Sequence, residues 1–221
     1  MKPIVLLGDT GKLEFIRVMK EQNFGMMIVN RIPSKLAYEA MPWGFDNMCF
    51  GAWRNGTEWD AGAWHIRALQ LRSKGFHPPL FAVVPDLPTK GNKSLEFSAR
   101  HLELVPHEFP KALALQDGMT YQSVREHLKT YKYDYLFLGG SDAFKVHCSD
   151  WKRFADDFGL PLHYARASTL EKLEHALHCE VASVDSSFPL VESRTLLPLH
   201  GYLCPRTSKL CTVPTIGRGY E

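Results

Sequence analysis

Short apolar runs alternate with longer segments of helical periodicity along this chain. The runs are rich in Val, Ile, Leu and Phe, which is typical of buried strands when a run spans four to eight residues. Eight runs fit this description: Ile4–Gly8, Met26–Asn30, Gly44–Phe50, Leu80–Asp86, Ala112–Gln116, Tyr135–Gly140, Pro161–Ala165 and Val181–Ser186. The pattern therefore predicts eight strands.

The segments between these runs predict six helices. They span Lys12–Gln22, Asp60–Lys74, Ser94–Val105, Tyr121–Thr130, Asp150–Phe158 and Thr169–His178. Thr120, Ser149 and Ser168 stand at expected N-caps, where a side-chain oxygen accepts from unpaired helix N–H groups. Gly75 and Gly159 follow helix ends, where a left-handed residue is least strained if it is glycine.

Alternating strands and helices indicate parallel strands joined by helical crossovers. Eight such units close into a (β/α)8 TIM-type barrel, an α/β fold that usually takes about 250 residues. The chain has 221 residues, so we expect a compact barrel over residues 1–187. Residues 31–42 and 188–221 do not follow the alternation, and we expect the second segment to be an irregular C-terminal tail that caps the same domain.

Composition and charge narrow the class of protein. The chain is 45% hydrophobic and 23% charged, which is ordinary for a globular domain. Its formal net charge of +2 neither supports nor excludes a nucleic-acid partner, because a basic patch can lie within a near-neutral total. Five scattered cysteines favour a reducing compartment. With no long apolar span, we expect a cytoplasmic protein without a membrane partner.

Polar and glycine residues follow most of the predicted strands. They are Asp46, Asn47, Asp86, Gln116, Asp117, Gly139, Gly140, Arg166 and Asp185, with His163 inside the seventh run. Any one of them could be a turn or cap residue. The βα loops of a parallel barrel converge at one end, however, and function gathers there. The three carboxylates Asp46, Asp86 and Asp185 together therefore predict a site.

Carboxylates around a barrel mouth suit several chemistries. Two of them can serve as nucleophile and general acid/base at a sugar anomeric carbon, and three can bind a divalent metal ion. An ionised Asp can also accept two hydrogen bonds from the adjacent N1 and N2 donors of guanine. A strand-end glycine allows a backbone N–H to approach a ligand carbonyl. The residues alone leave these alternatives open.

Six segments, in order, carry a resemblance to a known family. They are GFDNMCFGAWRNGTEWD (44–60), FAVVPD (81–86), LALQDG (113–118), YLFLGGS (135–141), PLHYARASTLEKLEHAL (161–177) and VASVDSS (181–187). Together they resemble the tRNA-guanine transglycosylase superfamily, and within it the compact phage and bacterial enzymes that insert 7-deazaguanines into DNA. The resemblance implies a TIM-type barrel and a base-exchange reaction.

The resemblance also implies roles for individual residues. Asp185 corresponds to the nucleophile that attacks C1′, expels guanine and forms a covalent glycosyl-enzyme. Asp46 corresponds to the second carboxylate, which transfers protons. Four residues correspond to the binding site for the base: Asp86 and Gln116 at the purine edge, and Gly139 and Gly140 at the exocyclic group. The remaining strand-end residues are expected substrate contacts: Asn47, Asp117, His163 and Arg166.

The expected partners follow from the same resemblance. They are DNA, or else tRNA, as substrate and a 7-deazaguanine base such as preQ0 or a derivative as co-substrate, with no cofactor. Bacterial tRNA enzymes of the superfamily carry a zinc site of three Cys and a His after the nucleophile strand. Here the tail offers His200, Cys204 and Cys211, a spacing that does not match a four-ligand site, so we expect no metal. The sequence does not indicate an oligomeric state.

The sequence leaves three other functions open. The first is the same base exchange on tRNA. The second is a hydrolase that releases a base from a nucleoside or nucleic acid, with water in place of the incoming base. The third is a barrel that binds a purine or a nucleic acid without catalysis.

Overall fold

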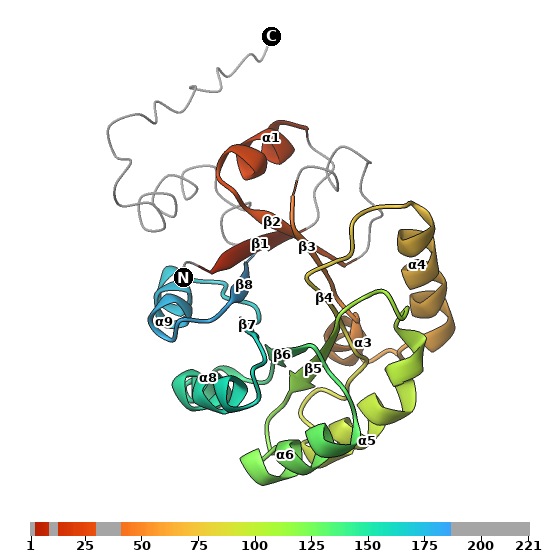
Figure 1. Ribbon diagram of the computed structural model, residues 1–221, viewed down its shortest axis with the longest axis vertical. Coiled ribbons are helices and arrows are strands. Elements are labelled where there is room, and N and C mark those ends of the chain that lie inside the picture. The colour runs from red at the N-terminus through yellow and green to blue at the C-terminus, as the bar shows by residue number, and fades with distance from the viewer. Residues whose placement is uncertain (1–2, 9–12, 30–40, 187–221) are drawn as a thin grey trace.

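A computed structural model describes residues 3–8, 13–29 and 41–186 of the chain (Figure 1). Eight parallel strands form a closed barrel in sequence order. They are β1 (Ile4–Gly8), β2 (Gly25–Ile28), β3 (Trp43–Phe45), β4 (Phe81–Val83), β5 (Lys111–Leu115), β6 (Tyr135–Leu138), β7 (Leu162–Tyr164) and β8 (Ser183–Ser186). The predicted compact (β/α)8 barrel is confirmed. The predicted C-terminal tail lies outside the described residues. It spans residues 188–221 and includes His200, Cys204 and Cys211.

Helices surround the barrel. They are α1 (Leu13–Glu21), α3 (Cys49–Arg54), α4 (Ala61–Ser73), α5 (Asn92–His101), α6 (Tyr121–Thr130), α7 (Asp142–Lys145), α8 (Cys148–Asp157) and α9 (Leu170–His178), with the 3-10 turn Leu102–Leu104 after α5. All six predicted helices form. The bounds of α6 are as predicted and those of the other five are shifted, whereas α3 and α7 were not predicted. In Figure 1, α3 lies inside the ring of outer helices. None of the helices described is both long enough and apolar enough to cross a lipid bilayer.

The predicted strand over Gly44–Phe50 is wrong in its second half, because β3 ends at Phe45 and α3 begins at Cys49. Two local hydrogen bonds end the strand. The Met48 N–H donates to Asp46 Oδ1 at 2.5 Å, and the Cys49 N–H donates to Asn47 Oδ1 at 2.9 Å. Such bonds from Asp and Asn to the backbone two residues on compete with the strand ladder and favour a turn.

Helix caps are predicted with mixed success. Thr120 caps α6 as expected. The cap of α9 is Thr169 rather than Ser168, and α8 begins after His147, so Ser149 is not its cap. Each miss displaces the cap by one or two residues. The two glycines expected after helix ends have positive φ: 68° at Gly75 and 63° at Gly159.

The barrel interior is filled by alternate residues of the strands. Its apolar part consists of Leu6, Met27, Phe81, Val83, Ala112, Ala114, Tyr135, Phe137 and Ala165. Small and large side chains share this space, as a narrow barrel requires. A Cβ on Gly44 would lie 3.0 Å from Met27 Sδ and 3.0 Å from Phe81 Cζ, so glycine at this position makes room for the larger side chains.

The same alternation directs polar side chains into the barrel. On β8, Val184 packs in the outer core between strands and helices, so Ser183 and Asp185 point inward, because successive strand residues face opposite sides. On β7, Leu162 and Tyr164 belong to the outer core, and His163 therefore faces inward. The register pairs His163 with Ser183. The strand period thus places these side chains beside one another inside the barrel.

Candidate active site

A cavity of about 1140 Å³ opens at the C-terminal ends of the strands. Drug-sized ligands occupy pockets of roughly 300–1,000 Å³, so a nucleotide has room here. Most of the predicted site residues line the cavity: Asp46, Asn47, Asp86, Gln116, Gly139, Gly140, Arg166 and Asp185. The two others lie just outside its lining: Asp117 and His163.

Asp185 is held through one of its two oxygens. Its Oδ1 accepts hydrogen bonds from His163 Nε2 at 2.9 Å and from the Arg166 N–H at 2.9 Å. Among the residues that the structure describes, none donates to Oδ2, and the side chain is 18% exposed. Asp185 therefore presents one anchored oxygen and one oxygen available for reaction.

Arg166 adopts a strained backbone conformation that serves Asp185. Its φ is 56°, a left-handed value that is uncommon for a residue with a side chain and is found at functional sites. The conformation directs its N–H toward Asp185. Its guanidinium donates to the Gly140 carbonyl at 2.6 Å and lies 3.8 Å from the centre of the Phe50 ring. Arg166 thus links the strand ends to α3.

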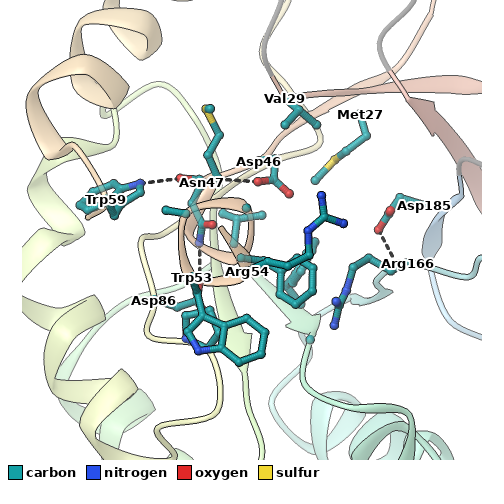
Figure 2. Close-up of a pocket in the computed structure, with 18 of the residues that line it drawn as sticks. Met27, Val29, Asp46, Asn47, Trp53, Arg54, Trp59, Asp86, Arg166 and Asp185 are labelled. Carbon is teal, nitrogen blue, oxygen red and sulfur yellow. Dashed lines mark hydrogen bonds between the residues drawn. The ribbon is translucent and has the colours of Figure 1, made fainter. Parts of the chain in front are cut away.

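Asp46 faces Asp185 across the cavity. Figure 2 shows the two carboxylates pointing toward one another. The pKa of Asp46 is raised to about 7, chiefly by burial and also by the charges of Asp185 and Asp86. The hydrogen bond from the Met48 N–H acts in the opposite direction and lowers the pKa. Met48 also has a left-handed backbone, with φ 64°. Asp46 can therefore both give and take a proton near neutral pH.

Asp86 lies between two amide side chains. Its Oδ1 accepts from Asn47 Nδ2 at 2.6 Å, and its Oδ2 accepts from Gln116 Nε2 at 2.5 Å. Asn47 Nδ2 also donates to the Val84 carbonyl at 3.0 Å. Burial raises the pKa of Asp86 to about 6, and the two amides oppose that rise. A ligand that binds this carboxylate must share it with the amides or displace one of them.

Gly139 and Gly140 bring backbone close to the cavity. A Cβ on Gly139 would lie 2.9 Å from Gln116 Nε2, and Gly140 has φ 70°. The Gly139 N–H already donates to the Leu115 carbonyl at 3.1 Å. The Gly140 N–H donates no hydrogen bond to another group in the described part of the chain, and Gly140 lines the cavity.

Asp117 supports this loop from outside the cavity. Its Oδ2 accepts from the Ser141 N–H at 2.7 Å, and its Oδ1 accepts from the Ser141 hydroxyl. Ser141 in turn caps α7. Asp117 therefore joins the ends of β5 and β6, a position from which it shapes the loop that carries Gly140.

Lys145 is a cavity residue that the sequence did not indicate. It is 1% exposed, and its Nζ donates to the Ala165 carbonyl at 2.5 Å. Burial lowers its pKa to about 8, the nearby Arg166 lowers it further, and Asp185 opposes this. Its helix has four residues, too few for a periodic signal. Lys145 braces the backbone next to Arg166.

The cavity rim carries aromatic and basic side chains from α3. Phe50, Trp53 and Arg54 all line it, and Trp53 is 47% exposed. An exposed aromatic ring of this kind can stack on an unpaired base.

A metal site is not evident in the part of the chain that the structure describes. Within residues 3–8, 13–29 and 41–186, no three His, Cys, Asp or Glu side chains are grouped so that they could hold a metal ion. All three cavity carboxylates instead accept a hydrogen bond from an amide N–H of the chain: Asp46, Asp86 and Asp185.

Comparisons with known proteins identify no family for this chain. No protein-family model matches the chain, and no curated protein sequence matches it. One similar solved structure is a mandelate racemase/muconate lactonizing enzyme-like protein from Rubrobacter xylanophilus, with a TM-score of 0.48 and 14% identity over 83% of this chain. The match covers 56% of that protein, so the chain spans little more than half its length. No activity follows from this likeness.

Proposed function

We propose that this protein is an enzyme, a transglycosylase that exchanges guanine in DNA for a 7-deazaguanine base through a covalent Asp185–glycosyl intermediate. The observation that carries the proposal is the contrast between two carboxylates that face each other. Asp185 accepts two hydrogen bonds on one oxygen and leaves the other open, whereas burial raises the pKa of Asp46 to about 7. Carboxylates in unlike environments divide the nucleophile and acid/base roles in this way.

The reaction follows from these positions. Oδ2 of Asp185 attacks C1′ of the nucleotide, and the C1′–N9 bond breaks with its electron pair going to guanine. Protonated Asp46 supplies the proton that the departing base takes up. The incoming 7-deazaguanine then gives its N9 proton to Asp46, its nitrogen bonds to C1′, and Asp185 leaves as the carboxylate. The covalent ester divides one difficult displacement into two easier ones.

The polar end of the cavity supports recognition of the base. Guanine offers adjacent N1 and N2 donors, which a carboxylate such as Asp86 accepts. Its O6 is an acceptor, and the Gly140 N–H lies on the neighbouring strand end without a partner among the described residues. Asn47 and Gln116 hold Asp86 from both sides. We expect these groups to read the guanine edge in both the leaving and the incoming base.

The substrate must present its base outside the stack, because the cavity lies at the barrel mouth and chemistry at C1′ needs an extruded nucleotide. Trp53, at 47% exposure, and Arg54 at the rim suit an unpaired strand. The assignment to DNA rather than tRNA rests on the resemblance to the compact DNA-type enzymes, and exchange on tRNA is the second candidate that the experiment must address.

The test is covalent capture. The full chain is incubated with guanine-containing single- and double-stranded DNA and, separately, with tRNA, and then resolved on a denaturing gel. We expect a DNA adduct and incorporation of labelled guanine, both lost in Asp185→Asn. The matched control is Asp150→Asn, a surface carboxylate paired with Arg153 on α8, which should retain both.

Other outcomes identify other functions. An adduct with tRNA alone would replace DNA as the substrate, and release of free base without exchange would indicate a hydrolase. Binding without turnover on every polymer would indicate a purine- or nucleic-acid-binding barrel. Exchange that survives in Asp185→Asn would refute the assigned nucleophile.

A further inference from the structure

A continuous chain of hydrogen bonds runs from Asp185 into the barrel. His163 Nε2 lies 2.9 Å from Asp185 Oδ1, and His163 Nδ1 lies 2.9 Å from Ser183 Oγ. Ser183 Oγ lies 3.1 Å from the hydroxyl of Tyr135. His163 and Ser183 are fully buried and Tyr135 is 8% exposed. Three neighbouring strands, β6, β7 and β8, thus supply one buried network that ends at the proposed nucleophile.

The direction of this chain depends on the charge of Asp185. An ionised carboxylate accepts hydrogen bonds and donates none, so His163 must carry its proton on Nε2. Its Nδ1 then accepts from the Ser183 hydroxyl, which accepts in turn from Tyr135. In this arrangement the Ser183 hydroxyl both donates and accepts, and each ring nitrogen of His163 makes one hydrogen bond. The other ring tautomer would require a protonated Asp185 and a reversal of both hydroxyl bonds.

We propose that Tyr135, Ser183 and His163 form a positioning relay that fixes the Nε2–H tautomer of His163 and thereby anchors Oδ1 of Asp185, leaving Oδ2 as the reacting oxygen. This inference rests on the proposed function in that it assigns Asp185 as the nucleophile. The relay residues act through Asp185 rather than by touching the substrate. They explain why a fully buried histidine lies beneath a carboxylate of the cavity.

The surroundings of His163 favour its neutral form. Burial lowers its pKa, Asp185 opposes this through its hydrogen bond and its charge, and the Lys145 ammonium lowers the pKa further. Two uncharged aromatic rings pack against the imidazole. Phe137 stacks on it at 4.8 Å between ring centres, and Phe81 lies at 4.8 Å on a tilted plane. A neutral imidazole with one N–H is therefore the species that the relay has to orient.

Stacking and hydrogen bonding together restrict the ring. Rotation of the His163 side chain would break both hydrogen bonds and the contact with Phe137 at once. The Arg166 N–H approaches the same oxygen, Oδ1, from the β7 loop. Two donors from different directions define the plane of the Asp185 carboxylate and so the direction in which Oδ2 points. Preorganisation of this kind lowers the reorganisation needed for attack.

The experiment reads the tautomer directly. Full-length protein labelled with ¹⁵N-histidine is examined by NMR from pH 5 to pH 8, and the His163 signals are assigned by their loss in His163→Gln. We expect a protonated Nε2 and an unprotonated Nδ1 across this range. In Ser183→Ala the Nδ1 signal should shift, and adduct formation should slow by about tenfold to a hundredfold, the usual effect of losing a hydrogen bond in a charged network. Tyr135→Phe should act in the same direction with a smaller effect.

The chain offers a matched control. Tyr133 makes a buried hydrogen bond of 2.9 Å with His127, a second tyrosine–histidine pair, and neither residue lines the cavity. Tyr133→Phe removes the same type of bond and should leave both the His163 signals and the rate of adduct formation unchanged. Equal losses in Tyr133→Phe and Tyr135→Phe would show a general effect on stability and would overturn the relay.

The outcomes separate this inference from the proposed function. A protonated Nδ1 or a doubly protonated ring at pH 7 overturns the relay, as does a Ser183→Ala variant whose ring signals and rate are unchanged. If Ser183→Ala does not fold, the tautomer in the wild type and the shift in Tyr135→Phe decide the question. If no polymer forms an adduct, the proposed function fails. The ring signals of wild type and Ser183→Ala then still support or overturn the anchoring of Asp185.

Discussion

Replacement of Asp46 by asparagine should stabilise the fold while it abolishes exchange. Burial raises the pKa of Asp46 from 3.8 to about 7, so the folded protein binds a proton more tightly than the unfolded chain does. The folded state then loses stability as the pH rises from about 4 to about 7, because the unfolded chain releases this proton first. Asp46→Asn is neutral at every pH and avoids that cost.

The size of the effect follows from the same values. A difference of about three pH units corresponds to about 4 kcal/mol at pH 7 and above, at about 1.4 kcal/mol per unit. Asp46 is partly open to the cavity, and solvent screening reduces the cost, so we expect a gain of about 1–3 kcal/mol at pH 7.5 and nearly none at pH 4. The asparagine Oδ1 can still accept from the Met48 N–H, which preserves the turn.

Urea unfolding at pH 4, 5.5 and 7.5 measures this difference, and the adduct assay on the same samples measures function. The exposed carboxylate variant Asp150→Asn provides the baseline, and its stability relative to wild type should not follow this pH trend. The reasoning is refuted if Asp46→Asn is less stable than wild type at pH 7.5, or if the difference does not change with pH. A stable and fully active variant would remove Asp46 from the reaction.

Three further variants test the surrounding structure. Gly140→Ala should lower the free energy of unfolding in urea by about 1–3 kcal/mol more than Gly159→Ala does. Both glycines have left-handed φ, but only a Cβ on Gly140 would crowd a carboxylate oxygen, at 2.7 Å. Equal losses of stability would show that this crowding has no effect. Lys145→Met removes the hydrogen bond to the Ala165 carbonyl and should slow adduct formation about tenfold. The affinity for guanine, measured by calorimetry, should not change. A loss of affinity without a slower rate would instead indicate that Lys145 contacts the bound base. Asp86→Asn should weaken guanine binding at least about tenfold, and retained affinity would exclude it from base recognition.

The strand pattern predicted the barrel and the place of its key residues at the strand ends. Asp185 ends an apolar run, and the strand period of two is enough to put it on the same face as Ser183 once Val184 packs outside. The error over Gly44–Phe50 has a local cause. Asp46 and Asn47 bind backbone N–H groups two residues on, and those bonds outweigh the strand preference of the apolar residues around them.

Other features of the site depend on distant parts of the chain and could not be predicted. Lys145 is buried because the Ala165 carbonyl, 20 positions away, accepts its ammonium hydrogen bond, and no pattern within its four-residue helix records this. The pKa of Asp46 depends on burial by several βα loops together with the charges of Asp185 and Asp86. A strand-end carboxylate in the sequence looks the same whether its pKa is ordinary or raised.

The two facing carboxylates share a device that ties their geometry to the backbone. Met48 and Arg166 both have left-handed φ, 64° and 56°, although neither is glycine, and each donates its N–H to a carboxylate of the site, Asp46 and Asp185 respectively. Such conformations cost roughly 1–3 kcal/mol each and persist where the surrounding structure enforces them. In both cases the N–H occupies one carboxylate oxygen and leaves the other to the cavity. Because this donor is a main-chain group, its part in orienting each carboxylate depends on the strand–loop path and not on the side chain of residue 48 or 166. For that reason the residue types at positions 48 and 166 give no sequence signal for it.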